Sequence, residues 1–279
     1  MGLSKEQIAR YGRQLILPEI GVAGQERLLR ASVLLIGTGG LGSPAALYLA
    51  AAGIGHLALI DRETLTLSNL HRQVLYTTQG IGSSKVLEAR LRLVSLNSDV
   101  RVTAIQKELT AANALQVIQP FDWVIDGTDN FPSRYLINDA CVMLGKPFVH
   151  GAVVQFRGQI MTVQPKKSAC LRCVFPEIPQ PGAIPDCDQA GVLGACAGLM
   201  GSLMAHEALK GILGVGSPLT DQLVVFEGLS SHFRHVSVRR DPQCAVCGDE
   251  PTIRQLSVIE STTCAVAPVV ESSPVFLRG

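Results

Sequence analysis

The sequence predicts an α/β protein built on a doubly wound, mainly parallel sheet. Short apolar segments of strand length alternate along the chain with longer segments of helical periodicity, an order typical of parallel strands joined by helices. The first apolar segment runs directly into a cluster of glycines, and a helix-forming segment follows. The last two expected strands look like an antiparallel pair, so we expect the parallel sheet to continue into antiparallel strands.

Composition and charge are those of a globular protein. Of the 279 residues, 47% are hydrophobic and 17% are charged, so a sizeable core can form. The formal net charge of +1 gives no overall field for nucleic acid or a membrane surface, and we expect neither as a partner. The N-terminus lacks the apolar core of a signal peptide, and glycines interrupt the apolar stretch from Leu41 to Ile60. We therefore expect a cytoplasmic protein without a membrane helix.

The first half of the chain predicts the alternating strands and helices of the sheet. Residues 4–30 alternate charged and apolar positions at helical spacing, with Pro18 and Gly21 between two short helices. Strands are expected at 32–36, 56–60, 100–105 and 123–126, and helices at 43–52, 85–96, 111–118 and 133–144. Gly53 is expected to end the helix before it. The connections should be right-handed crossovers.

The second half predicts mostly strands. They are expected at 148–154, 159–163, 223–227 and 233–238, and the last two are expected to pair antiparallel. The proline- and cysteine-rich residues 165–188 predict a loop, whereas residues 190–213, small and apolar throughout, predict a buried helix. After Gly248 the pattern weakens into a tail.

A glycine motif lies between the first strand and its helix. Gly37, Gly39, Gly40 and Gly42 fit the fingerprint of dinucleotide-binding, Rossmann-like folds, in which backbone amides and a helix N-terminus face a phosphate. Asp61 ends the second strand about 20 residues later, where a carboxylate can bind ribose hydroxyls. The motif indicates an adenine nucleotide without saying which one. The alternative is a glycine turn that serves packing alone.

Polar residues after the second strand favour a triphosphate. Asn69, Arg72, Gln73 and Lys85 gather there in the sequence. A triphosphate carries up to about four negative charges and requires cations, which the forked guanidinium of Arg72 and the ammonium of Lys85 would supply. Residue type alone also allows these two side chains to be solvated surface charges.

An acidic motif, Asp126-Gly-Thr-Asp129-Asn130, follows the fourth strand. It lies at the carboxyl edge of the sheet, where open α/β folds bind their ligands. A carboxylate beside phosphates is a natural Mg²⁺ ligand, so Asp129 predicts a magnesium site. The alternative is that the aspartate caps the next helix.

Two Cys-x-x-Cys pairs predict a metal site. Cys170, Cys173, Cys244 and Cys247 form a four-sulfur set suited to tetrahedral Zn²⁺, and the absence of an open position makes the site structural. The metal would tie the loop after the sheet to the C-terminal region. The remaining cysteines include Cys141 and Cys196, which we expect to pack in helices, whereas the role of Cys264 cannot be read from the sequence.

With these residues taken together, the chain resembles the MoeB/ThiF family, which is related to the ubiquitin-activating enzymes. The resemblance runs from about Tyr11 to Gly248. The matching segments are Arg10-Tyr-Gly-Arg13-Gln, Gly37 to Ser43, Leu-Ser-Asn69-Leu-His-Arg72-Gln73, Gly-x-x-Lys85-Val, Asp126-Gly-Thr-Asp129-Asn130 and the two cysteine pairs.

The resemblance implies a role for each of these residues. Asp61 would hold the ribose, Asn69, Arg72 and Lys85 the triphosphate, and Asp129 the Mg²⁺.

The resemblance also implies roles for Arg13 and Cys187, which lie in other parts of the chain. Arg13 would reach the phosphates of a neighbouring subunit in a homodimer with shared active sites, although residue type alone makes it an ordinary surface arginine. Cys187 matches the position of a thiol that some members use as a nucleophile and others do not need. Because Asp186 and Asp188 would raise the pKa of that thiol, its role stays open.

The resemblance also implies the chemistry. The activity would be ATP-dependent adenylylation of the C-terminal Gly-Gly carboxylate of a small ubiquitin-like sulfur-carrier protein, with release of pyrophosphate. An α-carboxyl group has a pKa of roughly 3.5, so it is ionised already and needs no general base. Too few residues follow Gly248 for a rhodanese domain, so we expect a separate sulfur donor.

We expect one adenylyltransferase domain over residues 1–248, followed by a tail at 249–279. Within it, 1–30 would hold the N-terminal helices, 31–165 the nucleotide-binding half and 166–248 the zinc-bound, carrier-facing half. Three alternatives stay open: a dehydratase or ligase that activates a small-molecule or RNA carboxylate, a nicotinamide-dependent oxidoreductase, and a scaffold that binds a ubiquitin-like partner without turnover. The pathway, whether molybdenum cofactor, thiamine, cysteine or thio-metabolite synthesis, is also left open.

Overall fold

A single mixed sheet runs through the part of the chain that the computed structural model describes, residues 2–179 and 190–258. The order of its eight strands is β3-β2-β1-β4-β5-β6-β7-β8. The strands are β1 (Ser32–Ile36), β2 (His56–Ile60), β3 (Arg101–Ile105), β4 (Trp123–Asp126), β5 (Phe148–Val154), β6 (Arg157–Val163), β7 (Gln222–Glu227) and β8 (His232–Ser237). Neighbours from β3 to β5 pair in parallel, and those from β5 to β8 pair antiparallel, which confirms the predicted fold class.

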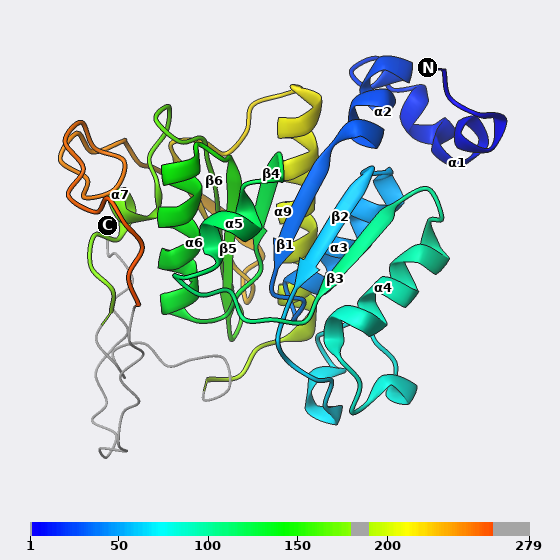
Figure 1. The fold of residues 1–279 in the computed structure, drawn as a ribbon, viewed down its shortest axis with the longest axis horizontal. Coiled ribbons are helices and arrows are strands. Elements are labelled where there is room, and N and C mark those ends of the chain that lie inside the picture. Colours follow the sequence, from blue (N-terminus) through cyan, green and yellow to red (C-terminus); the bar gives the residue numbers. More distant parts are fainter. Residues whose placement is uncertain (1, 180–189, 259–279) are drawn as a thin grey trace.

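Helices cover both faces of this sheet (Figure 1). They are α1 (Lys5–Leu15), α2 (Gly21–Arg30), α3 (Gly42–Ala52), α4 (Lys85–Leu96), α5 (Ala114–Ile118), α6 (Phe131–Leu144), α7 (Leu171–Val174) and α9 (Gly194–Leu213), with short 3₁₀ turns η1 (Leu67–Asn69) and η2 (Thr78–Gly80). Side chains of α3, α4 and α9 share one core cluster, and those of α5 and α6 share the other. β1 feeds both clusters: Val33 and Leu35 point into the first, Leu34 and Ile36 into the second. This explains why the strand is apolar at every buried position.

The predicted strand positions agree closely with the observed ones, and the differences have local causes. α6 begins at Phe131 rather than at 133 because Asn130 caps it and Pro132 fits its first turn. α5 begins at Ala114 rather than at 111 because Asn113 accepts a hydrogen bond from the backbone of Thr110 and forms a turn first. The predicted loop at 165–188 contains the short helix α7, and its residues from 180 onward lie outside the described ranges.

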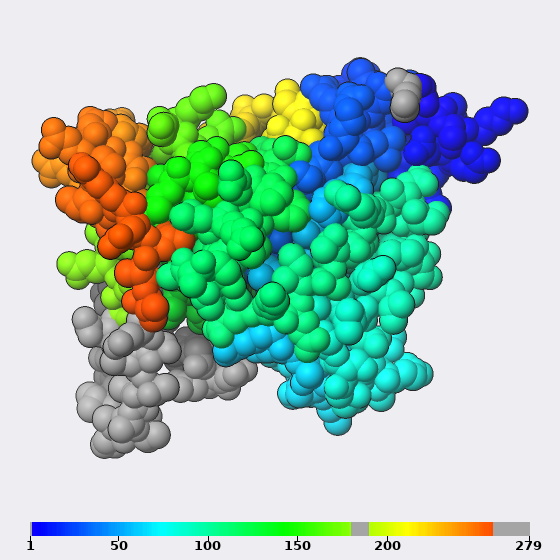
Figure 2. Space-filling model, viewed as in Figure 1, coloured from blue at the N-terminus to red at the C-terminus, as the bar shows by residue number. Residues whose placement is uncertain are grey.

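The apolar stretch from Leu41 to Ile60 folds as α3, a glycine turn and β2. Gly53 ends α3 in the left-handed conformation, with φ of 88°, as predicted. In residues 2–179 and 190–258, no helix is long and apolar enough to cross a membrane. In the space-filling view the N-terminal helices (blue) lie at one end of the molecule and residues 239–258 (orange to red) at the other (Figure 2).

The turn after β1 packs directly against the turn after β4. Gly37 has a φ of 83°, and a Cβ there would lie 2.9 Å from the carbonyl oxygen of Gly127. A Cβ on Gly42 would lie 2.1 Å from the carbonyl oxygen of Gly37. Both positions therefore require glycine for backbone packing, and they fix where α3 begins.

Gly42→Ala should thus destabilise the fold by about 2 kcal/mol, because the loop and the helix must separate to admit a methyl group. Gly198→Ala in α9 is the matched control, since a Cβ there meets nothing within 4 Å. Chemical denaturation of the two variants measures the difference. Equal stability of both would contradict the packing account.

Candidate functional site

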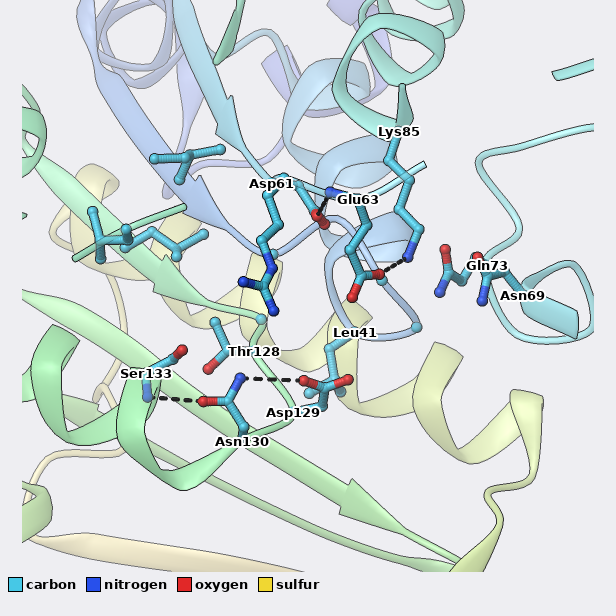
Figure 3. Close-up of a pocket in the computed structure, with 18 of the residues that line it drawn as sticks. Leu41, Asp61, Glu63, Asn69, Gln73, Lys85, Thr128, Asp129, Asn130 and Ser133 are labelled. Atoms are coloured by element: carbon cyan, nitrogen blue, oxygen red, sulfur yellow. Dashed lines mark hydrogen bonds and ion pairs between the residues drawn. The ribbon is translucent and has the colours of Figure 1, made fainter. Parts of the chain in front are cut away.

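A polar cavity of about 220 Å³ opens at the carboxyl ends of β1, β2 and β4 (Figure 3). This is the crevice at which strand order reverses in doubly wound folds and ligands bind. Of the predicted nucleotide residues, its wall contains Gly37, Gly39, Gly40, Asp61, Asn69, Arg72, Lys85 and Asp129. Gly42 lies behind the wall, where it packs against Gly37. The structure thus brings together residues that are up to about 90 positions apart in the sequence.

The two inner glycines of the loop leave room in the cavity. A Cβ on Gly39 would find no atom closer than 3.7 Å, and one on Gly40 none closer than 3.4 Å. Side chains there would fit the backbone packing but occupy cavity space. The loop leads into α3, whose first backbone N–H groups lack intrahelical acceptors and carry the positive end of the helix dipole. An anion is the ligand that such a corner favours.

Asp61 holds the turn after β1 in place. One carboxylate oxygen accepts hydrogen bonds from the backbone N–H of Thr38, at 2.9 Å, and from its hydroxyl, at 3.0 Å. The other oxygen accepts from the backbone N–H of Glu63, at 2.9 Å. A carboxylate offers about four acceptor positions, so capacity for a ribose hydroxyl remains. Its ribose role stays a prediction.

The cationic side chains of the cavity differ in their surroundings. Lys85 is only 2% exposed and pairs with the carboxylate of Glu63, so it is not a solvated surface charge. Arg72 is half-buried, and its Nη1 donates to the carbonyl oxygen of Ser68 at 3.0 Å. Asn69 accepts from the backbone of Thr66 and stabilises the 3₁₀ turn that carries this region.

The residues of the Asp126-to-Asn130 segment have different structural roles. Asp126 is fully buried and accepts from the backbone and hydroxyl of Thr128, at 3.1 and 2.6 Å. Its second oxygen lies 2.8 Å from Nδ1 of His150, so the turn is held from inside the sheet. Asn130 accepts from the backbone of Ser133 at 2.9 Å and is the cap of α6. Asp129 is exposed and does not cap the helix, which removes the alternative explanation for it.

Among the cavity residues that the sequence analysis does not single out are Arg134 and Glu63. Arg134 is 7% exposed and donates to the carbonyl oxygen of Thr128 at 3.3 and 3.4 Å, with Phe131 beneath its guanidinium. A cation in the first turn of a helix opposes the helix dipole, and that conflict is the signal by which Arg134 could have been found. Glu63 carried no such signal, because its partner Lys85 is 22 positions away.

Two predicted residues are not brought into this cavity. Arg13 is exposed on α1 and is absent from the cavity wall of its own chain. Cys187 lies outside the described residues.

Cys141 and Cys196 are buried in α6 and α9, as predicted for packing residues, and burial raises the pKa of both thiols.

The two Cys-x-x-Cys pairs meet in space. The sulfur atoms of Cys170, Cys173, Cys244 and Cys247 all lie within 4.8 Å of one another. Three of the separations are 3.3, 3.7 and 3.9 Å. Tetrahedral Zn²⁺ with Zn–S bonds of about 2.3 Å requires sulfur separations of about 3.8 Å, so the donor set fits a bound metal.

The thiol chemistry agrees with a metal site. Contacts among the four sulfurs lower the pKa of the Cys173 and Cys244 thiols and raise the pKa of the Cys170 thiol, so the first two ionise most readily. The backbone N–H of Asp241 also points at Sγ of Cys173, at 3.3 Å. Four protein sulfurs leave no open position, so the cluster is structural rather than catalytic.

Fold and cavity together define a doubly wound α/β protein in which a glycine loop and cationic side chains line one cavity, with a separate four-cysteine cluster. Comparison with known proteins agrees: the ThiF family matches residues 11–246, and the chain belongs to this family. This confirms the resemblance inferred from the sequence motifs, and it favours the adenylyltransferase prediction over the nicotinamide-dependent alternative.

Individual relatives are similar over most of the chain. The "Sulfur carrier protein adenylyltransferase" of Thermus thermophilus is 51% identical over 261 residues, which cover 92% of this chain and 96% of that protein. The "Adenylyltransferase and sulfurtransferase MOCS3" of Culex quinquefasciatus is 46% identical over 91% of this chain, which spans only 58% of the length of the mosquito protein. The crystal structure of E. coli MccB with MccA-N7isoASN has a TM-score of 0.77 at 24% identity, over 88% of this chain and 76% of that one, and shows the shared fold.

The capping assignment in the Asp126-to-Asn130 segment can be tested by stability alone. Asn130→Ala should lower the free energy of unfolding by about 1 kcal/mol, because it removes the cap of α6. Asp129→Ala should change it by less than about 0.5 kcal/mol. Denaturant titration without nucleotide measures both. A larger loss for Asp129→Ala would mean that Asp129 supports the fold.

Proposed function

We propose that this protein adenylylates the C-terminal carboxylate of a small sulfur-carrier protein at the expense of ATP. The observation that carries the proposal is the cavity itself, in which a glycine loop at a helix N-terminus faces Arg72, Lys85 and Arg134. The proposal is supported by 51% identity to an adenylyltransferase of nearly the same length. MOCS3, with 46% identity, also carries adenylyltransferase in its name.

The chemistry needs positioning more than proton transfer. An oxygen of the carrier's ionised carboxylate attacks the α-phosphorus of ATP, the bond to the bridging oxygen breaks, and pyrophosphate leaves with that electron pair. The cations would neutralise charge that moves onto the phosphoryl oxygens and the leaving group. Holding the two anionic reactants together in a preorganised pocket supplies much of the remaining rate enhancement. The product is a mixed anhydride between the carrier and AMP.

The polar residues predicted for the nucleotide site would each have a role in this reaction. Asp61 would hold the ribose, Asn69 and Arg72 the phosphates, and Lys85 the phosphates from the buried side. Asp129, exposed and not used as a cap, would hold Mg²⁺, which would supply positive charge that neutralises the phosphates. Arg134 adds a cation that the sequence motifs did not reveal.

The four-cysteine cluster would hold Zn²⁺. Its pairs come from the segment that carries α7 and from the C-terminal part of the described chain, so the metal would tie residues 166–248 into one half of a single domain of 1–248. The other half, 31–165, contains most of the cavity wall, with 1–30 as N-terminal helices. The globular body of the carrier would contact the zinc-bound half.

Removal of single cavity charges tests the function. Arg72→Ala and Asp129→Ala should each lower carrier-dependent pyrophosphate release by about 100-fold, because each removes a group aimed at the phosphates or the metal. Carrier binding should change by less than about twofold, since neither residue would contact the carrier's body. Arg30→Ala is the control, because Arg30 is exposed, lies outside the cavity wall and forms a 3.7 Å ion pair with Glu26. Unchanged pyrophosphate release in both cavity variants would contradict the proposal.

Arg13 and the assembly make a separate proposal. We infer a homodimer in which Arg13 of one subunit completes the phosphate site of the other, because Arg13 is exposed and absent from its own cavity wall. Cys187 would act as a nucleophilic thiol, as in some family members, and a separate protein would donate the sulfur.

Co-expression of two inactive variants tests the shared site. Arg13→Ala and Lys85→Ala subunits should together recover about a quarter of the normal activity, because half of the dimers would be mixed and each would hold one complete site. Each variant expressed alone provides the baseline. Activity no higher than that baseline, with mixed dimers demonstrated by a tag on each subunit, would place Arg13 outside the partner's site.

A further inference from the structure

The cavity contains an ion pair whose two members are buried to very different degrees. The side chain of Lys85 is 3% exposed, whereas that of Glu63 is 58% exposed (Figure 3). The ammonium therefore lies in the wall, and the carboxylate lies on the open side. In the described part of the chain, Glu63 is the only carboxylate that pairs with Lys85.

The backbone holds these two residues face to face. The N–H of Lys85 donates to the carbonyl oxygen of Glu63 at 3.1 Å, and Thr64 and Ser84 form an antiparallel bridge beside them. Asp61 accepts from the N–H of Glu63 and so ties the pair to the turn after β1. The pairing is a built feature of the cavity, because two backbone contacts and one side-chain contact specify it.

Because Lys85 is buried and Glu63 is exposed, only Glu63 can leave the ion pair and be solvated. An ammonium out of water needs a counter-ion, and removal of its partner leaves an uncompensated buried charge. The carboxylate of Glu63 can instead turn into solvent and regain its hydration. A phosphate that enters the cavity can therefore take the place of Glu63, whereas Lys85 cannot move away.

We propose that Glu63 is a displaceable counter-ion for Lys85. In the empty cavity it keeps the ammonium charged and aimed at the phosphate position, and the phosphates of ATP replace it on binding. The inference rests on the proposed function, since it takes ATP as the ligand. Glu63 therefore stabilises the unliganded protein but weakens ATP binding. Its carboxylate must be displaced when ATP binds, and it then lies near a polyanion of the same sign.

The test is ATP binding and thermal stability of Glu63→Gln in the full-length chain. The Kd for ATP should fall by about fivefold, and the Tm of the unliganded protein should fall as well. Glu63→Asp, which keeps the charge on a shorter side chain, should give a Kd for ATP between that of the unaltered protein and that of Glu63→Gln. Glu108→Gln is the matched control, because Glu108 pairs with Arg62 at 2.8 Å near the same opening and both are exposed. It should change the Kd by less than about twofold.

Three results would overturn the proposal. An unchanged Kd in Glu63→Gln would make the pair a purely structural contact. Weaker binding only when Mg²⁺ is present would make Glu63 a metal ligand, and weaker binding without Mg²⁺ would mean that Glu63 holds Lys85 in the ATP-bound state. Failure of the unaltered chain to bind ATP is a different result, since it would contradict the proposed function itself and remove the ligand that the inference needs.

Discussion

The close packing of two glycine turns is the contact on which the rest of the site depends. The turns after β1 and β4 meet at Gly37 and Gly127 with no side chain between them, and Gly42 packs behind Gly37. This contact lies where the strand order reverses, so the N-terminus of α3 and the segment around Asp129 open onto one crevice. Asp61 and Asp126 then fix the two turns from below through Thr38 and Thr128. The glycines make the close approach possible, and the carboxylates make it specific.

Two cations of the cavity wall are largely removed from solvent. Arg134 and Lys85 are both nearly buried, a condition that normally requires a paired carboxylate. In the part of the chain that the structure describes, Lys85 has one in Glu63, on the open side, whereas Arg134 contacts a carbonyl oxygen and an aromatic ring. Under the proposed function, the phosphates of ATP would be the counter-ions of both cations. In this account, binding energy comes from cations that the fold has already desolvated.

Local pattern predicted the frame of this site well. Strands β1, β2 and β4 and helix α4 have the expected bounds, because short apolar runs, glycine turns and helical periodicity are local signals. The cysteine pairs were also predictable, since Cys-x-x-Cys spacing is a local signal of metal binding, and the structure brings all four sulfurs together. The separation between Asp129 and the cap residue Asn130 was not predictable. Either side chain can cap a helix, and only the hydrogen bond to Ser133 distinguishes them.

Partnerships between distant residues were beyond sequence reasoning. The burial of Lys85 and its pairing with Glu63 follow from the bridge between Thr64 and Ser84. Local sequence periodicity does not predict this bridge. The contact of His150 with Asp126 likewise depends on the register of β4 against β5. The roles of Arg13 and Cys187 still rest on the family resemblance, because one would act in a neighbouring subunit and the other lies outside the described residues.

The central claim is that this cavity activates a protein carboxylate with ATP, and ATP–pyrophosphate exchange tests it most directly. The purified protein would be incubated with Mg²⁺, ATP, labelled pyrophosphate and each small Gly-Gly carrier encoded beside it, with the same carrier lacking its last glycine as the control. The account predicts exchange that depends on one intact carrier and disappears with the shortened one. ATP binding without carrier-dependent exchange would contradict the account and favour a small-molecule substrate or a binding role.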